Sequence, residues 1–245
     1  MTTDAYVHSI ETMGTVDGPG IRYVIFLQGC PLRCEFCHNP DTWRMTKGQT
    51  RSLQWLLEDI DDYVPYFRSS GGGVTVSGGE PLLQTGFLEL LFAELKKRNI
   101  HRVIDTSGYA EVEKIKRLME LTDLVMLSVK HPDPEKHRNI SGHSPDRPRA
   151  FARYLTKINL PVWIRYVIIP GISNAAKDLE GLADMVGKMP NVQRLELLPY
   201  NTLGKSKWEQ LGLSSPLLDL DPPTAQEMET VRSKMAGLLP GLKIV

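Results

Sequence analysis

Short apolar runs alternate with amphipathic stretches along the chain from residue 21 onward. Six of these runs predict β-strands, because each is rich in aliphatic and β-branched residues and is bounded by glycine, proline or polar residues. They cover residues 21–27, 74–78, 102–108, 124–130, 162–168 and 194–200. Between and after them, apolar residues recur three and four positions apart, which predicts helices. The helical stretches are 53–64, 88–95, 112–121, a stretch ending at Leu155, 179–186 and 225–238.

Strands that alternate with helices predict a parallel sheet covered by helices. The periodicity fits an incomplete barrel and an open, doubly wound sheet equally well. Residues 130–149 and the proline-rich residues 215–223 are predicted to be loops. A chain of 245 residues with 41% hydrophobic content can bury one sizeable core, so we expect a single domain over residues 1–245.

Polar residues and the glycines of a short motif follow the apolar core of several predicted strands. In both candidate architectures, ligands bind at the C-terminal end of the strands. These positions therefore mark the expected site. They are Gly78, Gly79, Glu80, Asp105, Thr106, Ser128, Lys130 and Asn201.

The balance of acidic and basic residues argues against nucleic acid and anionic membranes as binding partners. Lys and Arg together number 29, as do Asp and Glu, so the chain has no global basic field to attract nucleic acid or anionic lipid. No apolar run approaches the roughly 18 residues of a membrane span, and the first residues do not resemble a secretory leader. We expect a cytoplasmic monomer that binds neither nucleic acid nor membrane.

All three cysteines lie within eight residues, with the spacing C-x-x-x-C-x-x-C formed by Cys30, Cys34 and Cys37. An odd number of clustered cysteines is typical of a metal site in a reducing compartment. Thiolates suit both zinc and iron–sulfur clusters, and three of them leave one iron of a 4Fe–4S cluster open to bind a substrate. The alternative is a structural zinc with His38 as fourth ligand. The loop follows a strand at the same end as the other candidate site residues, which favours a catalytic site over a structural zinc.

Several of the other polar residues have both a functional and a structural interpretation. Gly78 and Gly79 allow a close backbone approach to a ligand, or form a structural turn. Glu80 is costly to bury unless it pairs with a cation or binds a partner, and we favour a role in orienting the site. Lys130 fits a ligand carboxylate, or is a solvated lysine. Arg165, in the centre of an apolar strand, needs an anionic or ligand partner or an internal salt bridge.

Two motifs together resemble the radical S-adenosylmethionine (SAM) superfamily: the cysteine loop with Phe36 before its third cysteine, and Ser-Gly-Gly-Glu-Pro at residues 77–81. Longer stretches, from residue 7 to the end, are similar to the family of pyruvate formate-lyase activating enzymes. These are GTVDGPGIR at 14–22, GGGVTVSGGEPLLQ at 71–84, TDLVML at 122–127, WIRYVIIPG at 163–171 and LLPY with LGKSKW at 197–208.

The resemblance implies a partial (β/α)6 barrel with one 4Fe–4S cluster on Cys30, Cys34 and Cys37, whose fourth iron is chelated by SAM. It further implies cleavage of SAM to a 5'-deoxyadenosyl radical, which abstracts a glycine Cα hydrogen on pyruvate formate-lyase, with flavodoxin or ferredoxin as electron donor. The implied SAM contacts are Phe36, Cys37, His38, Gly78, Gly79, Glu80, Ser128, Val129, Lys130, Arg165 and Asn201. Two alternatives remain: activation of a different glycyl radical enzyme or other radical SAM chemistry, and a zinc-stabilised binding module.

The resemblance also implies two further sites and two departures from the family pattern. Asp105 and Thr106 occupy positions that supply oxygen ligands to a monovalent cation, and Asp17 lies in the stretch that faces the glycyl peptide. The family usually has Asp-Leu-Lys where this chain has Ser128, Val129 and Lys130, and histidine where it has Asn201. We expect the cluster to bind as in the family, and SAM affinity or cation dependence to differ.

Overall fold

The computed structural model describes residues 3–245, apart from the side chain of Thr46. The chain forms two compact units. The first comprises the residues up to Pro31 and Thr42–Met126, and the second comprises Leu32–Asp41 and Leu127–Val245. Strand β6 (Leu124–Val129) contains the boundary between them. The single domain over residues 1–245 stays a prediction.

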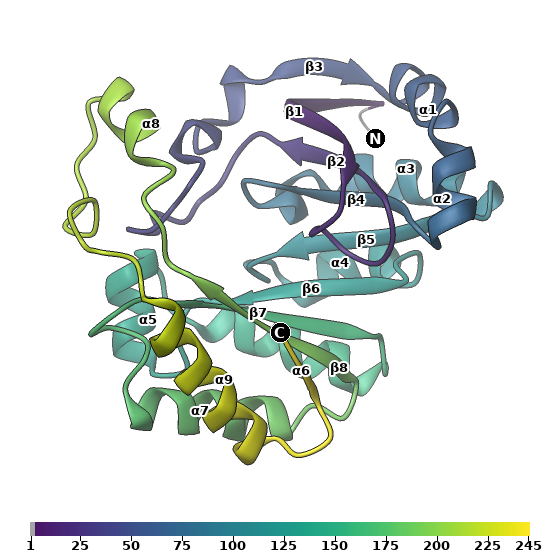
Figure 1. Cartoon of the computed structure of the whole chain (residues 1–245). Coiled ribbons are helices and arrows are strands. Elements are labelled where there is room, and N and C mark those ends of the chain that lie inside the picture. Colours follow the sequence, from purple (N-terminus) through teal and green to yellow (C-terminus); the bar gives the residue numbers. More distant parts are fainter. Residues whose placement is uncertain (1–2) are drawn as a thin grey trace. The chain divides into compact units, whose positions relative to one another are not determined.

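The first unit contains a sheet in which parallel strands carry the expected βα connections (Figure 1). β2 pairs with β4 and β4 with β5, all in parallel. β1 is antiparallel to both β2 and β3, so the order is β3-β1-β2-β4-β5. The elements are β1 (Asp4–Gly14), β2 (Arg22–Leu27), β3 (Gln49–Ser52), α1 (Leu53–Asp61), α2 (Val64–Ser70), β4 (Gly73–Gly78), α3 (Thr85–Lys97), β5 (His101–Thr106) and α4 (Val112–Met119), with single 3-10 turns at Met45–Lys47 and Pro81–Gln84. A further 3-10 turn, Pro40–Thr42, contains a boundary between the units in the sequence.

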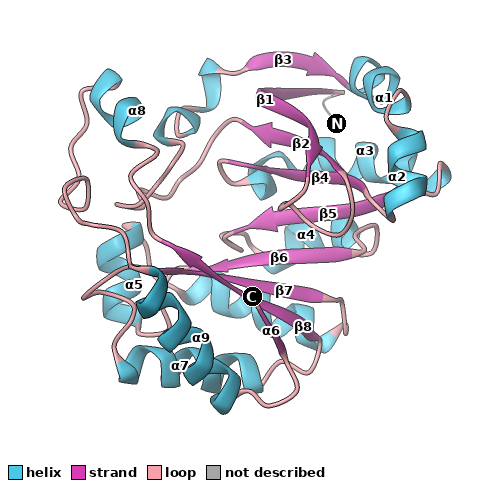
Figure 2. Ribbon diagram, in the orientation of Figure 1, coloured by secondary structure: helices cyan, strands magenta, loops and turns pink. Residues whose placement is uncertain are grey.

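The second unit repeats the parallel arrangement. β7 pairs with β8 and β8 with β9, again in parallel, and α9 packs on α7 and β8. Figure 2 shows that helices precede and follow β7 and β8 along this part of the chain. The elements are α5 (Pro134–Ser141), α6 (Asp146–Lys157), β7 (Val162–Ile168), α7 (Ala176–Gly187), β8 (Val192–Pro199), α8 (Lys205–Gln210), α9 (Ala225–Leu238) and β9 (Lys243–Ile244).

The six predicted strands correspond to β2, β4, β5, β6, β7 and β8, and the predicted helix over residues 225–238 is α9. The mostly parallel α/β fold is confirmed. Residues 215–223 contain no helix or strand, as expected. None of the helices in residues 3–245 combines the length and apolar character that crossing a bilayer requires.

The prediction that residues 130–149 form a loop was wrong, because this stretch contains all of α5 and the start of α6. Asp133 caps the first turn of α5 by accepting hydrogen bonds from two backbone N–H groups, and Pro134 follows it. Gly142 ends the helix with φ 77°. The start and stop signals were present, but the short, polar helix lacks the apolar stripe on which the prediction depended. The strands β1, β3 and β9 were also missed.

Candidate active site

In the first unit, the glycine pair after β4 packs against the start of the cysteine loop. The N–H of Gly79 donates to the Leu27 carbonyl at 2.9 Å and that of Glu80 to the Gly29 carbonyl at 2.8 Å. A Cβ on Gly78, which has φ 110°, would lie 2.3 Å from the Leu27 nitrogen, and one on Gly79 would lie 2.2 Å from the Gly29 oxygen. The chain's own backbone therefore requires both glycines.

Glu80 is fully buried, and its carboxylate binds the end of the neighbouring strand. It accepts hydrogen bonds from the N–H of Leu82 at 3.1 Å, from the N–H of Ser107 at 3.0 Å, and from the hydroxyls of Thr106 and Ser107. Burial raises the pKa of Glu80, and these hydrogen bonds act against that rise. Glu80 thus orients the end of β5 through neutral donors.

Asp105 and Thr106 are both engaged within the first unit. Asp105 accepts a hydrogen bond from the Ser77 hydroxyl at 2.8 Å, while the Thr106 hydroxyl donates to Glu80 and accepts from the N–H of Gly108 at 2.9 Å. The two side chains are oriented by these contacts. Their role as cation ligands stays a prediction.

The stretch that contains Asp17 lies over the first unit's sheet. The Asp17 carbonyl accepts a hydrogen bond from Thr75 in β4 at 2.7 Å, and Gly18 approaches Val103 in β5. Arg22, fully buried at the start of β2, donates to Thr75 at 2.9 Å. Burial lowers the pKa of Arg22 to about 9, and nearby carboxylates act against this shift.

In the second unit, the remainder of the cysteine loop is held by backbone contacts on both sides. The N–H groups of Arg33 and Glu35 donate to the carbonyls of Ser141 and Ile140 at the end of α5, at 2.9 and 3.0 Å. Those carbonyls have no partner within their own helix, so the loop satisfies them. On the other side, the Glu35 carbonyl accepts from Ser215 at 2.7 Å.

All three cysteines are reduced thiols outside any disulfide, and Cys34 is buried while Cys30 and Cys37 are half-buried. Burial raises the pKa of Cys34, against the lowering effect of nearby Lys130. Within residues 3–245, no group of three or more His, Cys, Asp or Glu side chains has the geometry to hold a metal ion. The donor set nevertheless fits an iron–sulfur cluster, because free thiols at this spacing become thiolates when iron binds.

Phe36 and His38 are positioned by their own packing in the second unit. Phe36 packs against Ile169, Tyr200 and Leu217, and the ammonium of Lys130 lies 5.5 Å from the centre of its ring. Burial lowers the pKa of His38, although a hydrogen bond to the Asn201 backbone acts the other way. The side-chain oxygen of Asn201 accepts from the N–H of Leu203 at 3.1 Å, which shapes the turn before α8.

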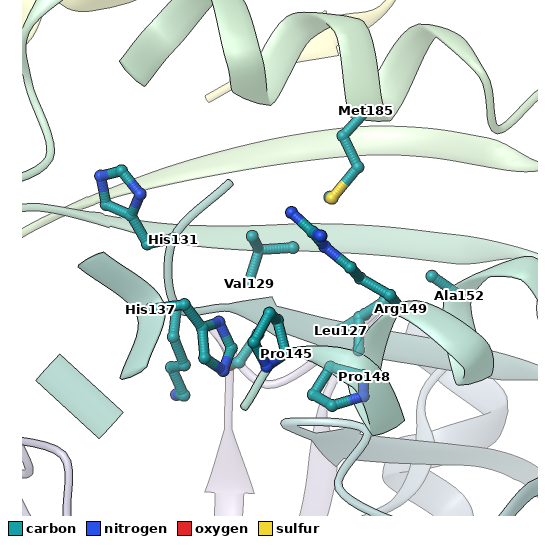
Figure 3. Close-up of a pocket in the computed structure, with 11 residues that line it drawn as sticks. Leu127, Val129, His131, His137, Pro145, Pro148, Arg149, Ala152 and Met185 are labelled. Carbon is teal, nitrogen blue, oxygen red and sulfur yellow. The ribbon is translucent and has the colours of Figure 1, made fainter. Parts of the chain in front are cut away.

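Behind the end of β6 lies a small cavity of about 30 Å³, shown in Figure 3. Ser128, Val129 and Lys130 line it together with His131 and His137. The cavity has room for a water molecule and is far too small for a cofactor. It lies beside the strand end that carries three of the predicted SAM contacts, Ser128, Val129 and Lys130.

Arg165 has an internal ionic partner, one of the two alternatives predicted for it. Its Nε lies 3.2 Å from Glu196, which also pairs with Arg194 at 3.0 Å. Arg194 in turn stacks on the ring of Trp163 at 4.5 Å. The parallel register of β7 and β8 sets Arg165 opposite Glu196 and Trp163 opposite Arg194, so these contacts follow from strand pairing.

Some residues that shape the site were missed at the sequence level. Ser77 lies inside the recognised motif at residues 77–81 and Ser107 directly follows Thr106, but no role was predicted for either. Glu196 interrupts an apolar strand, which is a signal for a buried ion pair. Trp208 donates its indole N–H to the Cys37 carbonyl at 2.8 Å. Nothing local to Trp208 indicates that contact.

The family model of the radical SAM superfamily matches residues 24–186. Pyruvate formate-lyase-activating enzymes of Staphylococcus epidermidis and Listeria monocytogenes are both 46% identical to the chain, over 89% of it and 90% of the relative. The chain therefore belongs to the radical SAM superfamily and, within it, to the family of pyruvate formate-lyase-activating enzymes. Membership implies one 4Fe–4S cluster and SAM as cofactors of an oxidoreductase.

Solved structures share the fold. A domain of a pyruvate formate-lyase-activating enzyme from Bacteroides vulgatus has a TM-score of 0.59 at 24% identity, and covers 71% of this chain and 98% of that one. A radical SAM methyltransferase from Sphaerobacter thermophilus has a TM-score of 0.65 at 17% identity, and covers 94% and 70%. At these identities the likeness concerns the fold alone.

Proposed function

We propose that the chain activates pyruvate formate-lyase by placing a glycyl radical on it. The observation that carries this proposal is the 46% identity over 89% of the chain to enzymes named for that activity. The three free cysteines at the spacing of the superfamily support it. The zinc-stabilised binding module has no comparable support.

Cys30, Cys34 and Cys37 would hold the cluster as thiolates, and SAM would take the remaining iron. When bound and reduced by one electron, this pair of cofactors would cleave SAM to methionine and supply a 5'-deoxyadenosyl radical, which would take hydrogen from a glycine Cα of the partner. The protein contributes orientation and exclusion of water. The fixed backbone of the cysteine loop supports that role, since Arg33 and Glu35 tie it to α5.

The SAM contacts are divided among strand ends. The turn at Gly78 and Gly79 presents its backbone to the SAM amino group, while Glu80 holds the turn to β5. Lys130 offsets the SAM carboxylate. Arg165 takes part with its charge balanced by Glu196, so its guanidinium reaches the ligand only through donors that the ion pair leaves over. Phe36, His38, Ser128, Val129 and Asn201 complete the contacts.

The glycyl peptide is received by the stretch that includes Asp17, whose backbone is anchored to β4 by Thr75. Asp105 and Thr106 contribute oxygen ligands to a monovalent cation. With Ser128 in place of a family carboxylate, that cation is bound more weakly. The protein acts as a cytoplasmic, single-domain monomer that receives electrons from flavodoxin or ferredoxin.

The test is anaerobic reconstitution with iron and sulfide, followed by reduction and measurement of 5'-deoxyadenosine with and without pyruvate formate-lyase. Electron paramagnetic resonance reports the glycyl radical. We expect a radical that depends on the partner, on SAM and on the reductant. A Cys34→Ala variant that binds less iron and forms no radical is the matched control.

Three other outcomes would contradict the proposal in different ways. SAM cleavage without a radical on pyruvate formate-lyase would assign the chemistry to a different glycyl radical enzyme or to another substrate. A colourless protein that binds one zinc and ignores SAM would indicate the zinc-stabilised module. A radical that still forms with Cys34→Ala would remove this cysteine from the ligand set.

A further inference from the structure

Helix α8 and the residues around it make their contacts with the cysteine loop through polar groups of defined geometry. The indole N–H of Trp208 donates to the Cys37 carbonyl at 2.8 Å, and Ser215 donates to the Glu35 carbonyl at 2.7 Å. The Lys207 ammonium donates to the Asn39 side chain at 2.8 Å. Residues 207–215 thus contact every second residue of the loop from Glu35 to Asn39.

The backbone of Gly204, the residue that precedes α8, also lies directly against the loop. A Cβ on Gly204 would lie 2.9 Å from the His38 Cα and 3.0 Å from the Cys37 oxygen. Lys207 pairs with Asp41 as well, at 3.1 Å. Trp208 itself is only 5% exposed. The burial of Trp208 strengthens the hydrogen bond that its indole donates.

The two ends of this segment are anchored in the second unit. The Tyr200 hydroxyl donates to the Leu217 carbonyl, and Tyr200 and Leu217 pack with Ile169 under Phe36 of the cysteine loop. The segment between them, residues 201–216, includes exposed apolar side chains, and Leu203 is 83% exposed. Its described polar contacts beyond itself run largely to the loop.

We propose that Trp208 is a positioning residue for the iron–sulfur cluster. Its N–H fixes the peptide that follows Cys37, so that α8 and Ser215 latch the cysteine loop in the conformation that binds iron. A cysteine side chain has one rotatable bond before its sulfur, so the backbone of Cys37 and one rotamer determine where its thiolate points. Fixing the carbonyl therefore fixes the ligand, as groups behind metal ligands commonly do.

Trp208→Phe tests this, because it removes the N–H and retains most of the buried aromatic packing. The matched control is Trp55→Phe, the same substitution on α1 in the first unit, where Trp55 is 38% exposed. Both variants and the wild type are reconstituted anaerobically, and loss of the cluster to an iron chelator is followed by visible absorption. The unfolding midpoint of each iron-free protein is measured in parallel.

We expect Trp208→Phe to lose its cluster about tenfold faster than the wild type, the size typical of removing one well-oriented hydrogen bond behind a ligand. The resonance spectrum of its reduced cluster should shift, which a purely packing role would not cause. The iron-free protein should melt a few degrees below the wild type, because one buried hydrogen bond and part of the indole packing are lost. Cluster loss within twofold of Trp55→Phe, with an unchanged spectrum, would overturn the inference.

Ser215→Ala provides a second route if Trp208→Phe does not fold. It removes the contact to the Glu35 carbonyl, together with the hydrogen bond that the Ser215 hydroxyl accepts from the N–H of Leu217 at 3.2 Å. It should also accelerate cluster loss, whereas an unchanged rate would count against the latch. The inference rests on the cofactor of the proposed function, but iron retention is measured without any protein partner. If the protein failed to activate pyruvate formate-lyase, the rate of cluster loss would still test the role of Trp208.

Discussion

Glu80 accepts two hydrogen bonds from Ser107, one from its backbone N–H at 3.0 Å and one from its hydroxyl. Glu80 follows β4 and Ser107 follows β5, so a single buried carboxylate ties together the ends of two paired strands. The same carboxylate accepts from Thr106. The Gly-Gly-Glu turn is therefore fixed by the protein itself, before a ligand binds.

Replacing Glu80 by glutamine should destabilise the protein. The amide group places a donor against the donors of Ser107 or Thr106, which leaves a buried group unsatisfied at a cost of about 2 kcal/mol. Urea unfolding of the iron-free protein measures this. Glu58→Gln, at an exposed position on α1, should change the free energy of unfolding by less than about 0.5 kcal/mol, and equal losses in the two variants would contradict the explanation.

Two glycines should respond oppositely to alanine. Gly78→Ala places a Cβ 2.3 Å from the Leu27 nitrogen at a φ of 110°, so we expect poor folding or a loss of several kcal/mol, on the order of 3. A Cβ on Gly86, in the first turn of α3, would meet no described atom within 4 Å. Gly86→Ala should stabilise the helix by about 0.5 kcal/mol. Thermal unfolding of both variants checks the contrast.

Glu196→Gln should cost about 3 kcal/mol of stability, because it leaves the guanidiniums of Arg165 and Arg194 close together without their shared carboxylate. The control is Glu180→Gln, which breaks the exposed pair with Lys234 and should cost less than about 1 kcal/mol. Denaturant unfolding distinguishes them. A small loss in Glu196→Gln would show that the two arginines find other partners.

His137 should make the protein sensitive to acid. Burial lowers its pKa from 6.5 to about 4, although a hydrogen bond to the His131 backbone opposes this. Because the pKa of His137 is lower in the folded than in the unfolded protein, protonation favours unfolding. The stabilising contribution is complete above the unfolded-state pKa of 6.5. It is lost as pH falls from 6.5 towards 4, by about 2 kcal/mol at pH 5.

The variant His137→Asn retains a donor but cannot take up a proton, so its stability should fall less between pH 7 and pH 5 than that of the wild type. Circular dichroism during urea unfolding at the two pH values gives the comparison. His8→Asn controls for replacing a histidine elsewhere. If His137→Asn and the wild type lose stability in parallel, another group carries the acid sensitivity.

Ser128→Asp should introduce a dependence on monovalent cations. A hydroxyl binds such a cation more weakly than a carboxylate, so potassium should change SAM affinity little in the wild type and raise it about tenfold in the variant. Titration of SAM with and without potassium, followed by the cluster spectrum, measures both. Equal responses of wild type and variant would place the cation away from residue 128.

The sequence by itself determined the βα order, the last helix and the cysteine loop, because each depends on spacing within a few residues. It left open what Arg165 pairs with, missed α5, and gave no indication of the contacts of Trp208. Arg165 meets Glu196 only through the register of β7 and β8, and Trp208 meets Cys37 across 171 positions. Sequence periodicity indicates which face of a helix or strand is apolar. A contact between distant residues depends in addition on the register of paired strands and on the conformation of loops. Tertiary structure alone decided those contacts.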